Sequence, residues 1–288
     1  MIKRALGFIL LLQSLAFAAP VEELLSEFTR EQKLSSLVVA LYNGKTGRLL
    51  TYGNATEQTP YKLASITKVF TATALSLEIL SGKLTLETPV TALLPNLKGL
   101  SSITLLQLAT HTSGLPRTGP IQLRQTGRFL YSNLGYGLLG SMLSALEQKP
   151  YGALIRTLIT EPLGMESTYT FDHPLPASGA LISTGADMLR FLEANLGVKG
   201  PPKLISAMRF AQEGRLQVNP RLTMGLGWHR VGKFVEKNGA LPGYSSYIGL
   251  IPEANIGIVL LTDRNKIPLA PLGRLLLNLM LNSENAED

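Results

Sequence analysis

Residues 65–81 read SITKVFTATALSLEILS, a segment with almost no polar surface. Apolar side chains recur around it from Ile66 to Leu80, and Gly82 follows as a residue typical of the position just past a helix end. A helix that is apolar on nearly every side is buried in a protein core. The sequence therefore predicts a central helix here, with the other elements packed around it.

Ser65 and Lys68 lie three residues apart at the start of this helix. Residues at positions i and i+3 share one helix face, so the lysine amine can approach the serine hydroxyl. An adjacent base activates a weak alcohol nucleophile by removing its proton as it attacks. A chain of this length shows roughly one such spacing by chance, so the hypothesis of a nucleophilic serine depends on partners elsewhere.

Strand patterns occur near both ends of the chain. Apolar runs at residues 37–42 and 48–52 flank a hairpin turn, and two further strands are predicted at residues 244–251 and 256–262. A shorter run at residues 225–230 also has strand character.

The middle of the chain, residues 85–206, is predicted to be mainly helical and rich in loops. Within this region, helices are predicted at residues 134–147 and 151–160. Outside it, they are predicted at residues 21–33 and 269–281. We therefore expect an α+β fold of the α/β sandwich type. In it, an antiparallel sheet built from both chain ends is flanked by helices, and a mainly helical region is inserted.

The N-terminal residues have the pattern of a secretory signal peptide. Basic Lys3 and Arg4 precede an apolar run, and Ala16-Phe17-Ala18 supplies small residues for cleavage. The apolar run is shorter than the roughly 20 residues of a comfortable membrane span, which disfavours the alternative of an N-terminal anchor. We expect a signal peptide over residues 1–18, cleaved after Ala18, a single domain over residues 19–288, and a periplasmic or secreted protein.

Composition narrows the classes of function. The chain has no cysteine, which excludes disulfides and a lipid-modified cysteine. Its net charge of +7 comes from scattered basic residues, which argues against nucleic acid as a partner. The three histidines are far apart and no His-Glu-x-x-His spacing occurs, so we expect neither a metal nor another cofactor. No Gly-x-Ser-x-Gly elbow occurs either, which argues against an α/β-hydrolase.

Two further motifs follow Ser65-x-x-Lys68 along the chain. Tyr131-Ser132-Asn133 immediately precedes the helix predicted at residue 134, and Lys237-Asn238-Gly239 is followed by Ala240 and by a predicted strand. In this order the three elements resemble the active site of the serine β-lactamase and penicillin-recognising family, in its class C branch. Segments similar to family signatures occur at residues 103–116, 162–165 and 225–228. The resemblance implies a β-lactamase/transpeptidase-like fold.

Two earlier copies of these motifs are rejected. Lys45-Thr46-Gly47 and Tyr52-Gly53-Asn54 match the lysine and tyrosine motifs, but both precede Ser65. The family order is serine, tyrosine, lysine. Gly47 of the first copy and the preceding Gly44 are explained by the predicted hairpin turn.

The resemblance implies a role for each matching residue. Ser65 is expected to be the nucleophile, with Lys68 and Tyr131 exchanging protons around it. Asn133, Lys237, Asn238, Gly239 and Ala240 are expected to bind substrate. The backbone N–H groups of Ser65 and Ala240 are expected to form the oxyanion hole.

Ordinary structural roles remain open for these side chains: Ser65 or Asn133 could cap a helix, and Tyr131 could be a core residue. Physical chemistry adds that burial should lower the pKa of Lys68, while two nearby lysines should lower that of Tyr131.

The expected function is hydrolysis through an acyl-enzyme. A β-lactamase is the first interpretation, a D-Ala-D-Ala carboxypeptidase or D-amino-acid peptidase the second, and a carboxylesterase the third. A relative that binds without catalysis is the alternative of a different class. The expected partner is a small β-lactam or a peptidoglycan-derived peptide, and the protein is expected to be a monomer. Lys237 follows Tyr131 by only 106 positions, a compact interval that predicts the loss of loops around the substrate side chain.

Overall fold

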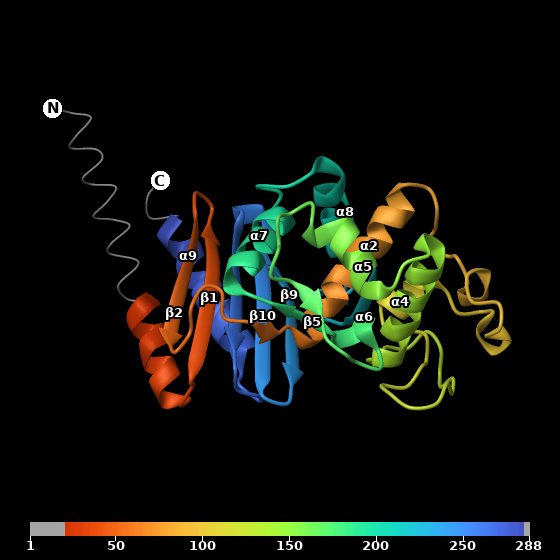
Figure 1. Ribbon diagram of the computed structural model, residues 1–288, viewed down its shortest axis with the longest axis horizontal. Coiled ribbons are helices and arrows are strands. Elements are labelled where there is room, and N and C mark those ends of the chain that lie inside the picture. The colour runs from red at the N-terminus through yellow and green to blue at the C-terminus, as the bar shows by residue number, and fades with distance from the viewer. Residues whose placement is uncertain (1–20, 285–288) are drawn as a thin grey trace.

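The computed structural model describes residues 21–284 and centres on an eight-stranded antiparallel sheet (Figure 1). From one edge to the other the strands are β2 (Gly47–Gly53), β1 (Ser36–Asn43), β11 (Ile256–Thr262), β10 (Tyr244–Ile251), β9 (Phe234–Leu241), β8 (His229–Val231), β7 (Leu222–Met224) and β6 (Leu216–Asn219). β1 pairs with β11 in the register Leu37 to Thr262, so segments from both ends of the chain lie side by side.

Helices cover both faces of this sheet. The C-terminal helix α9 (Leu269–Glu284) and the N-terminal helix (residues 21–31) share one apolar cluster with the sheet. The helix α7 (Gly185–Leu196) packs on the opposite face, against β1 and β11. The strands β1 and β11 are therefore buried on both faces of the sheet, which is why their sequences are almost continuously apolar.

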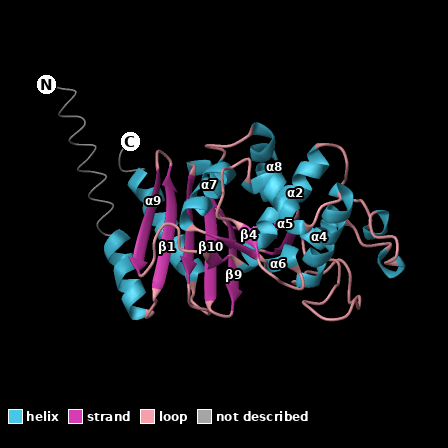
Figure 2. Ribbon diagram, in the orientation of Figure 1, coloured by secondary structure: helices cyan, strands magenta, loops and turns pink. Residues whose placement is uncertain are grey.

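The inserted region lies beyond the β9 side of the sheet (Figure 2). Its centre is η1 (Ala64–Ile66) followed by α2 (Thr67–Leu80), whose side chains are buried almost throughout. Around them lie η2 (Val90–Ala92), η3 (Lys98–Leu100), α3 (Leu105–Ala109), α4 (Asn133–Glu147), α5 (Tyr151–Ile155), the π-helical turn η4 (Arg156–Thr160), α6 (Pro176–Gly179) and α8 (Pro202–Gln212). A small sheet of β3 (Tyr61–Lys62), β5 (Leu181–Ser183) and β4 (Tyr169–Thr170) lies in the same region, and η5 (Pro252–Ala254) joins β10 to β11.

The expected fold class is confirmed, including the sheet assembled from both chain ends and the central helix. The predicted signal peptide at residues 1–18 lies outside the described residues. No helix among residues 21–284 combines the length and apolarity needed to cross a membrane.

One local prediction was wrong, and one strand was missed. Residues 225–230 do not form a continuous strand, because β8 begins only at His229. Gly227 has φ +76°, and a Cβ there would lie 2.9 Å from the backbone oxygen of Lys68. This segment is shaped by close contact with α2. The strand predicted after Lys237-Asn238-Gly239 is confirmed as β10, but the motif itself lies inside β9, a strand that the sequence pattern did not predict.

Candidate active site

Ser65 lies at the junction between the small sheet and the central helix. It is the middle residue of η1, directly ahead of α2, and its side chain is half-buried. The preceding residue, Ala64, has φ +48°, in the left-handed region that residues with a side chain rarely adopt. Such strained positions concentrate at functional sites, where the surrounding structure enforces them.

Lys68 reaches Ser65 from one turn further along the same helix. Its Nζ lies 3.3 Å from the Ser65 Oγ, 2.8 Å from the Asn133 Oδ1 and 2.7 Å from the backbone oxygen of Ser178. The side chain is fully buried, and no carboxylate forms an ion pair with it among residues 21–284. Burial holds the pKa of Lys68 well below its ordinary value, and the positive charge of Lys237 lowers it further. A neutral amine beside Ser65 can act as a base.

Tyr131 also reaches Ser65. Its hydroxyl donates a hydrogen bond of 2.9 Å to the Ser65 Oγ. The Nζ atoms of Lys68 and Lys237 lie 5.0 and 4.9 Å from the centre of its ring. Ser65 thus has a phenol and an amine within reach, as the sequence predicts.

The expected direction of the Tyr131 pKa shift was wrong. Burial raises the pKa of Tyr131, although the hydrogen bond to Ser65 and the charge of Arg117 oppose this rise. The two nearby lysines do not reverse this rise, because burial also lowers their own pKa values. Tyr131 is therefore a protonated phenol in the free enzyme, suited to donating a proton.

Asn133 is the first residue of α4, and its amide oxygen accepts a hydrogen bond from Lys68. The cap of this helix is Ser132, whose Oγ accepts a hydrogen bond of 2.8 Å from the N–H of Gly135. The capping role that was open for Asn133 therefore belongs to its neighbour, which leaves the Asn133 side chain for the cluster.

Lys237 enters the cluster from β9. Its side chain is 1% exposed, and burial lowers its pKa to about 7. Its Nζ lies 3.1 Å from the Nε2 of His229. Asn238, next along the strand, is exposed, as is Ala240.

Gly239 brings this strand against the start of the central helix. A Cβ at this position would lie 2.5 Å from the backbone oxygen of Leu63 and 2.9 Å from the backbone nitrogen of Ser65. No side chain fits there. β9 pairs with β8 only over residues 234–236, so among residues 21–284 the following part of that edge, including Ala240, has no strand partner on that side. The expected oxyanion donors Ser65 and Ala240 therefore belong to two segments in close contact.

Three residues of this cluster were not anticipated. Ser178 contributes only a backbone oxygen, which no sequence pattern reveals. His111 packs its ring 4.3 Å from that of Tyr131, and its Nδ1 accepts a hydrogen bond from the N–H of Ser132. His229 contacts Lys237. His111 lies within the family-like segment at residues 103–116, and His229 directly follows the one at residues 225–228. This proximity was the only feature of the sequence that could have indicated them. No trio of His, Cys, Asp or Glu side chains arranged for a metal ion occurs among residues 21–284.

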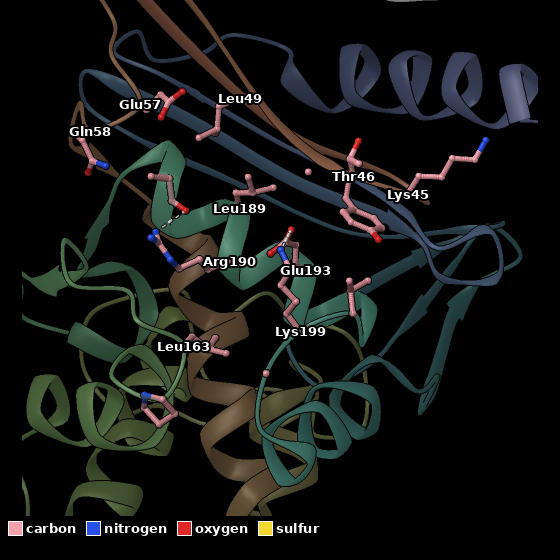
Figure 3. A pocket seen from close by; sticks show the side chains of 16 residues that line it. Lys45, Thr46, Leu49, Glu57, Gln58, Leu163, Leu189, Arg190, Glu193 and Lys199 are labelled. Atoms are coloured by element: carbon pink, nitrogen blue, oxygen red, sulfur yellow. Dashed lines mark hydrogen bonds and ion pairs between the residues drawn. The ribbon is translucent and has the colours of Figure 1, made fainter. Parts of the chain in front are cut away.

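The rejected motif copy Lys45-Thr46-Gly47 lies elsewhere, on the rim of a cleft of about 970 Å³ between the β1–β2 hairpin and α7 (Figure 3). The cleft is lined by charged groups such as Glu193, which forms an ion pair of 2.9 Å with Lys199. Figure 3 shows the Lys45 side chain pointing away from that pair. None of the residues expected at the active site lines this cleft.

Comparisons with known proteins agree with the fold and identify the family. The family model described as Beta-lactamase matches residues 21–279. The Beta-lactamase of Pseudomonas fluorescens is 24% identical, over 85% of this chain and 93% of that protein. The D-alanyl-D-alanine-carboxypeptidase/endopeptidase AmpH of Escherichia coli (strain K12) is 26% identical, over 72% of this chain and 71% of that protein. A solved class C beta-lactamase superposes with a TM-score of 0.84 at 22% identity, over 93% of this chain and 96% of that one.

Together these matches define an enzyme of the serine hydrolase class. The chain belongs to the beta-lactamase family. The alignment with the Pseudomonas fluorescens protein extends over 333 positions, more than the 288 residues of this chain, so that relative carries insertions.

Proposed function

We propose that the protein hydrolyses β-lactams through an acyl-enzyme on Ser65. The observation that carries this proposal is the convergence of the Lys68 amine and the Tyr131 hydroxyl on one serine oxygen, at 3.3 and 2.9 Å. Beside them a buried Lys237 offers a positive charge for the carboxylate of a substrate. A module that only binds has no need for this combination.

In the acylation step, the Ser65 oxygen bonds to the lactam carbonyl carbon while its proton passes to the neutral amine of Lys68. The N–H groups of Ser65 and Ala240 stabilise the oxyanion. As the carbon–nitrogen bond breaks, Tyr131 gives its proton to the leaving nitrogen and regains one from Lys68. Asn133 orients Lys68 and the substrate amide.

In the deacylation step, water attacks the ester carbonyl and gives a proton to Lys68, with Tyr131 in the relay. Ser65 regains a proton as the acyl bond breaks, and the free enzyme is restored.

A second candidate, a D-alanyl-D-alanine carboxypeptidase, uses the same acylation chemistry and is favoured by the similarity to AmpH. The β-lactamase activity is favoured over the carboxypeptidase activity because the Pseudomonas fluorescens relative aligns over more of this chain than AmpH does. The two functions differ in how fast the acyl-enzyme is hydrolysed. Nitrocefin turnover combined with labelling by a fluorescent penicillin separates them.

Fast nitrocefin turnover with little retained label supports the β-lactamase. A persistent label on the peptide that contains Ser65, located by mass spectrometry, supports the carboxypeptidase. Ser65→Ala should abolish both signals with little change in the thermal unfolding midpoint, whereas the exposed-serine control Ser101→Ala should retain them. Neither label nor turnover in the wild type would contradict the proposal, and turnover by Ser65→Ala would refute the nucleophile.

We also infer that the protein is exported, because the basic residues Lys3 and Arg4 and the Ala16-Phe17-Ala18 pattern are those of a cleaved signal peptide. Expression in a Gram-negative host should yield a periplasmic protein whose first residue is Ala19. N-terminal sequencing measures this directly, and a start at Met1 in the membrane fraction would refute it.

A further inference from the structure

Lys237 is held in an unusual environment for a group expected to bind an anion. Its Nζ is buried, yet no carboxylate forms an ion pair with it in the part of the chain that the structure describes. Its one hydrogen-bond partner there is the Nε2 of His229, at 3.1 Å. A buried ammonium without an acceptor carries a large desolvation cost, so this contact matters to its charge state.

His229 is suited to be an acceptor. Burial lowers its pKa to about 2, and the positive charges of Lys237, Arg274 and Lys68 contribute to the same shift. The imidazole is therefore neutral throughout the physiological range. When Lys237 is protonated, the Nε2 beside it presents its lone pair, which places the ring proton on Nδ1.

The other groups around this pair do not supply a negative charge. Tyr131 presents its ring to Lys237, and His111 and Lys68 lie on the helical side of the cluster. Glu236, the neighbour of Lys237 on β9, is already bound. It accepts hydrogen bonds from Tyr247 of the neighbouring strand β10 and from Arg274 of α9. His229 is thus the acceptor that remains for Lys237.

We propose that His229 is a specificity-determining residue, which positions the Lys237 ammonium and keeps it charged so that it binds the carboxylate of the substrate. This inference rests on the proposed function, since it assigns substrates with a carboxylate to the same site. His229 acts through Lys237 and is a positioning residue, because it does not touch the reacting atoms.

A dependence on pH follows from this arrangement. The free enzyme loses the Lys237 charge as the pH rises through about 7, so kcat/KM for a carboxylate substrate should fall there. A bound carboxylate stabilises the ammonium, so kcat should fall only at a higher pH. Without the imidazole acceptor the ammonium is less stable, and the fall in kcat/KM should move to lower pH.

The test compares His229→Phe, which removes the acceptor, with His229→Gln, whose side-chain oxygen can replace it. Nitrocefin carries a carboxylate, whereas p-nitrophenyl acetate does not. For His229→Phe we expect kcat/KM on nitrocefin to fall about tenfold at pH 7, mainly through KM, with its fall at high pH displaced about one pH unit downward. The loss on the ester should be much smaller, and His229→Gln should restore most of the nitrocefin activity.

The matched control is His173→Gln, a histidine outside the cluster whose Nδ1 accepts a hydrogen bond from the N–H of Leu175. It should leave both activities and the pH profile unchanged. An equal loss on nitrocefin and ester in His229→Phe, or an unmoved pH profile, would overturn the inference.

A measurement that needs no turnover separates this inference from the proposed function. In protein with ¹³C-labelled lysine, the Lys237 signal is assigned by its absence from Lys237→Met. It should titrate near pH 7 in the wild type and about one pH unit lower in His229→Phe. Identical titrations would show that His229 does not sustain the charge, whether or not the enzyme hydrolyses lactams.

Discussion

Tyr131 and Lys68 both contact the Ser65 Oγ, and burial shifts their pKa values in opposite directions. Burial disfavours whichever form of a group is charged, so it leaves the phenol protonated and the amine neutral. The free enzyme therefore contains a base and an acid in contact with Ser65 without any carboxylate. The cations over the Tyr131 ring do not reverse this, because burial is the larger effect.

Replacing Tyr131 with phenylalanine tests the acid role. Tyr131→Phe removes the hydroxyl that contacts Ser65 and keeps the ring that packs on His111. We expect a loss of about 10²-fold or more in kcat, the scale of lost acid–base assistance, with little change in stability. Steady-state turnover and thermal unfolding measure the two effects. A near-normal rate would assign proton delivery to Lys68.

Burying Lys237 should cost stability in a pH-dependent way. Below pH 7 the lysine is protonated in both the folded and the unfolded protein, and the full desolvation cost is present. Between about pH 7 and its ordinary pKa of 10.5, the unfolded state binds more protons, so the stability of the wild type rises with pH. Lys237→Met removes this cost, and its unfolding midpoint should exceed that of the wild type most at pH 6. The difference should shrink toward pH 10, and a constant difference would contradict the argument.

At the scale of elements, the site depends on the contact between β9 and η1. Gly239 allows this contact because a Cβ would overlap the backbone oxygen of Leu63 and approach the nitrogen of Ser65. The Oγ of Ser246 on β10 also donates a hydrogen bond of 2.7 Å to the Leu63 oxygen. The sheet therefore holds the start of the helix through the close approach of Gly239 and through a side-chain hydrogen bond from β10 to the Leu63 backbone oxygen.

Gly239→Ala tests this contact. The added methyl group must push β9 away from η1 and misplace the oxyanion donors, so we expect kcat/KM to fall by about 10²-fold or more. Gly99→Ala is the control, because a Cβ there meets no atom within 4 Å and the backbone is not left-handed. Equal activity in the two variants would show that β9 can retreat without cost to catalysis.

The position of Lys237-Asn238-Gly239 inside β9 shows why local sequence was insufficient for this element. Asn-Gly is a strong turn signal, which favours a break before the following strand. In the structure Gly239 pairs with Ser246 and Lys237 with Ile248, and the sheet keeps the segment extended. The glycine serves the close approach to Ser65, a reason that exists only once the chain is folded.

At the scale of the whole molecule, segments near both ends of the chain form the large sheet and the helices on one of its faces. The strand β9 of this sheet carries part of the site. The face of the sheet that packs on α9 and the N-terminal helix is held by an apolar cluster that includes Leu272, Leu276 and Leu277. Arg274 of α9 also binds Glu236, directly beside Lys237 on β9. Stability and catalysis therefore depend on different faces of the same sheet.

Two neighbouring leucines of α9 test this separation. Leu277 is fully buried, and Leu277→Ala should lower the free energy of unfolding by about 2–5 kcal/mol. Leu275 is 46% exposed, and Leu275→Ala should cost much less. Denaturant unfolding measures the difference. Below the unfolding transition both variants should retain wild-type kcat/KM, and a selective catalytic loss in Leu277→Ala would show that α9 also shapes the active site.

The sequence by itself determined the central helix and the strands near both chain ends. It also identified Ser65, Lys68, Tyr131, Asn133 and Lys237 as candidate active-site residues. Helix periodicity, strand alternation and motif order are properties of neighbouring residues, so they can be read along the chain. Tertiary structure alone decided the pKa direction of Tyr131, the contributions of Ser178 and His229, and the need for Gly239. Ser178 meets Lys68 across 110 residues, and His229 meets Lys237 because β8 and β9 are adjacent strands. These contacts arise only when the chain folds, and no local pattern records them.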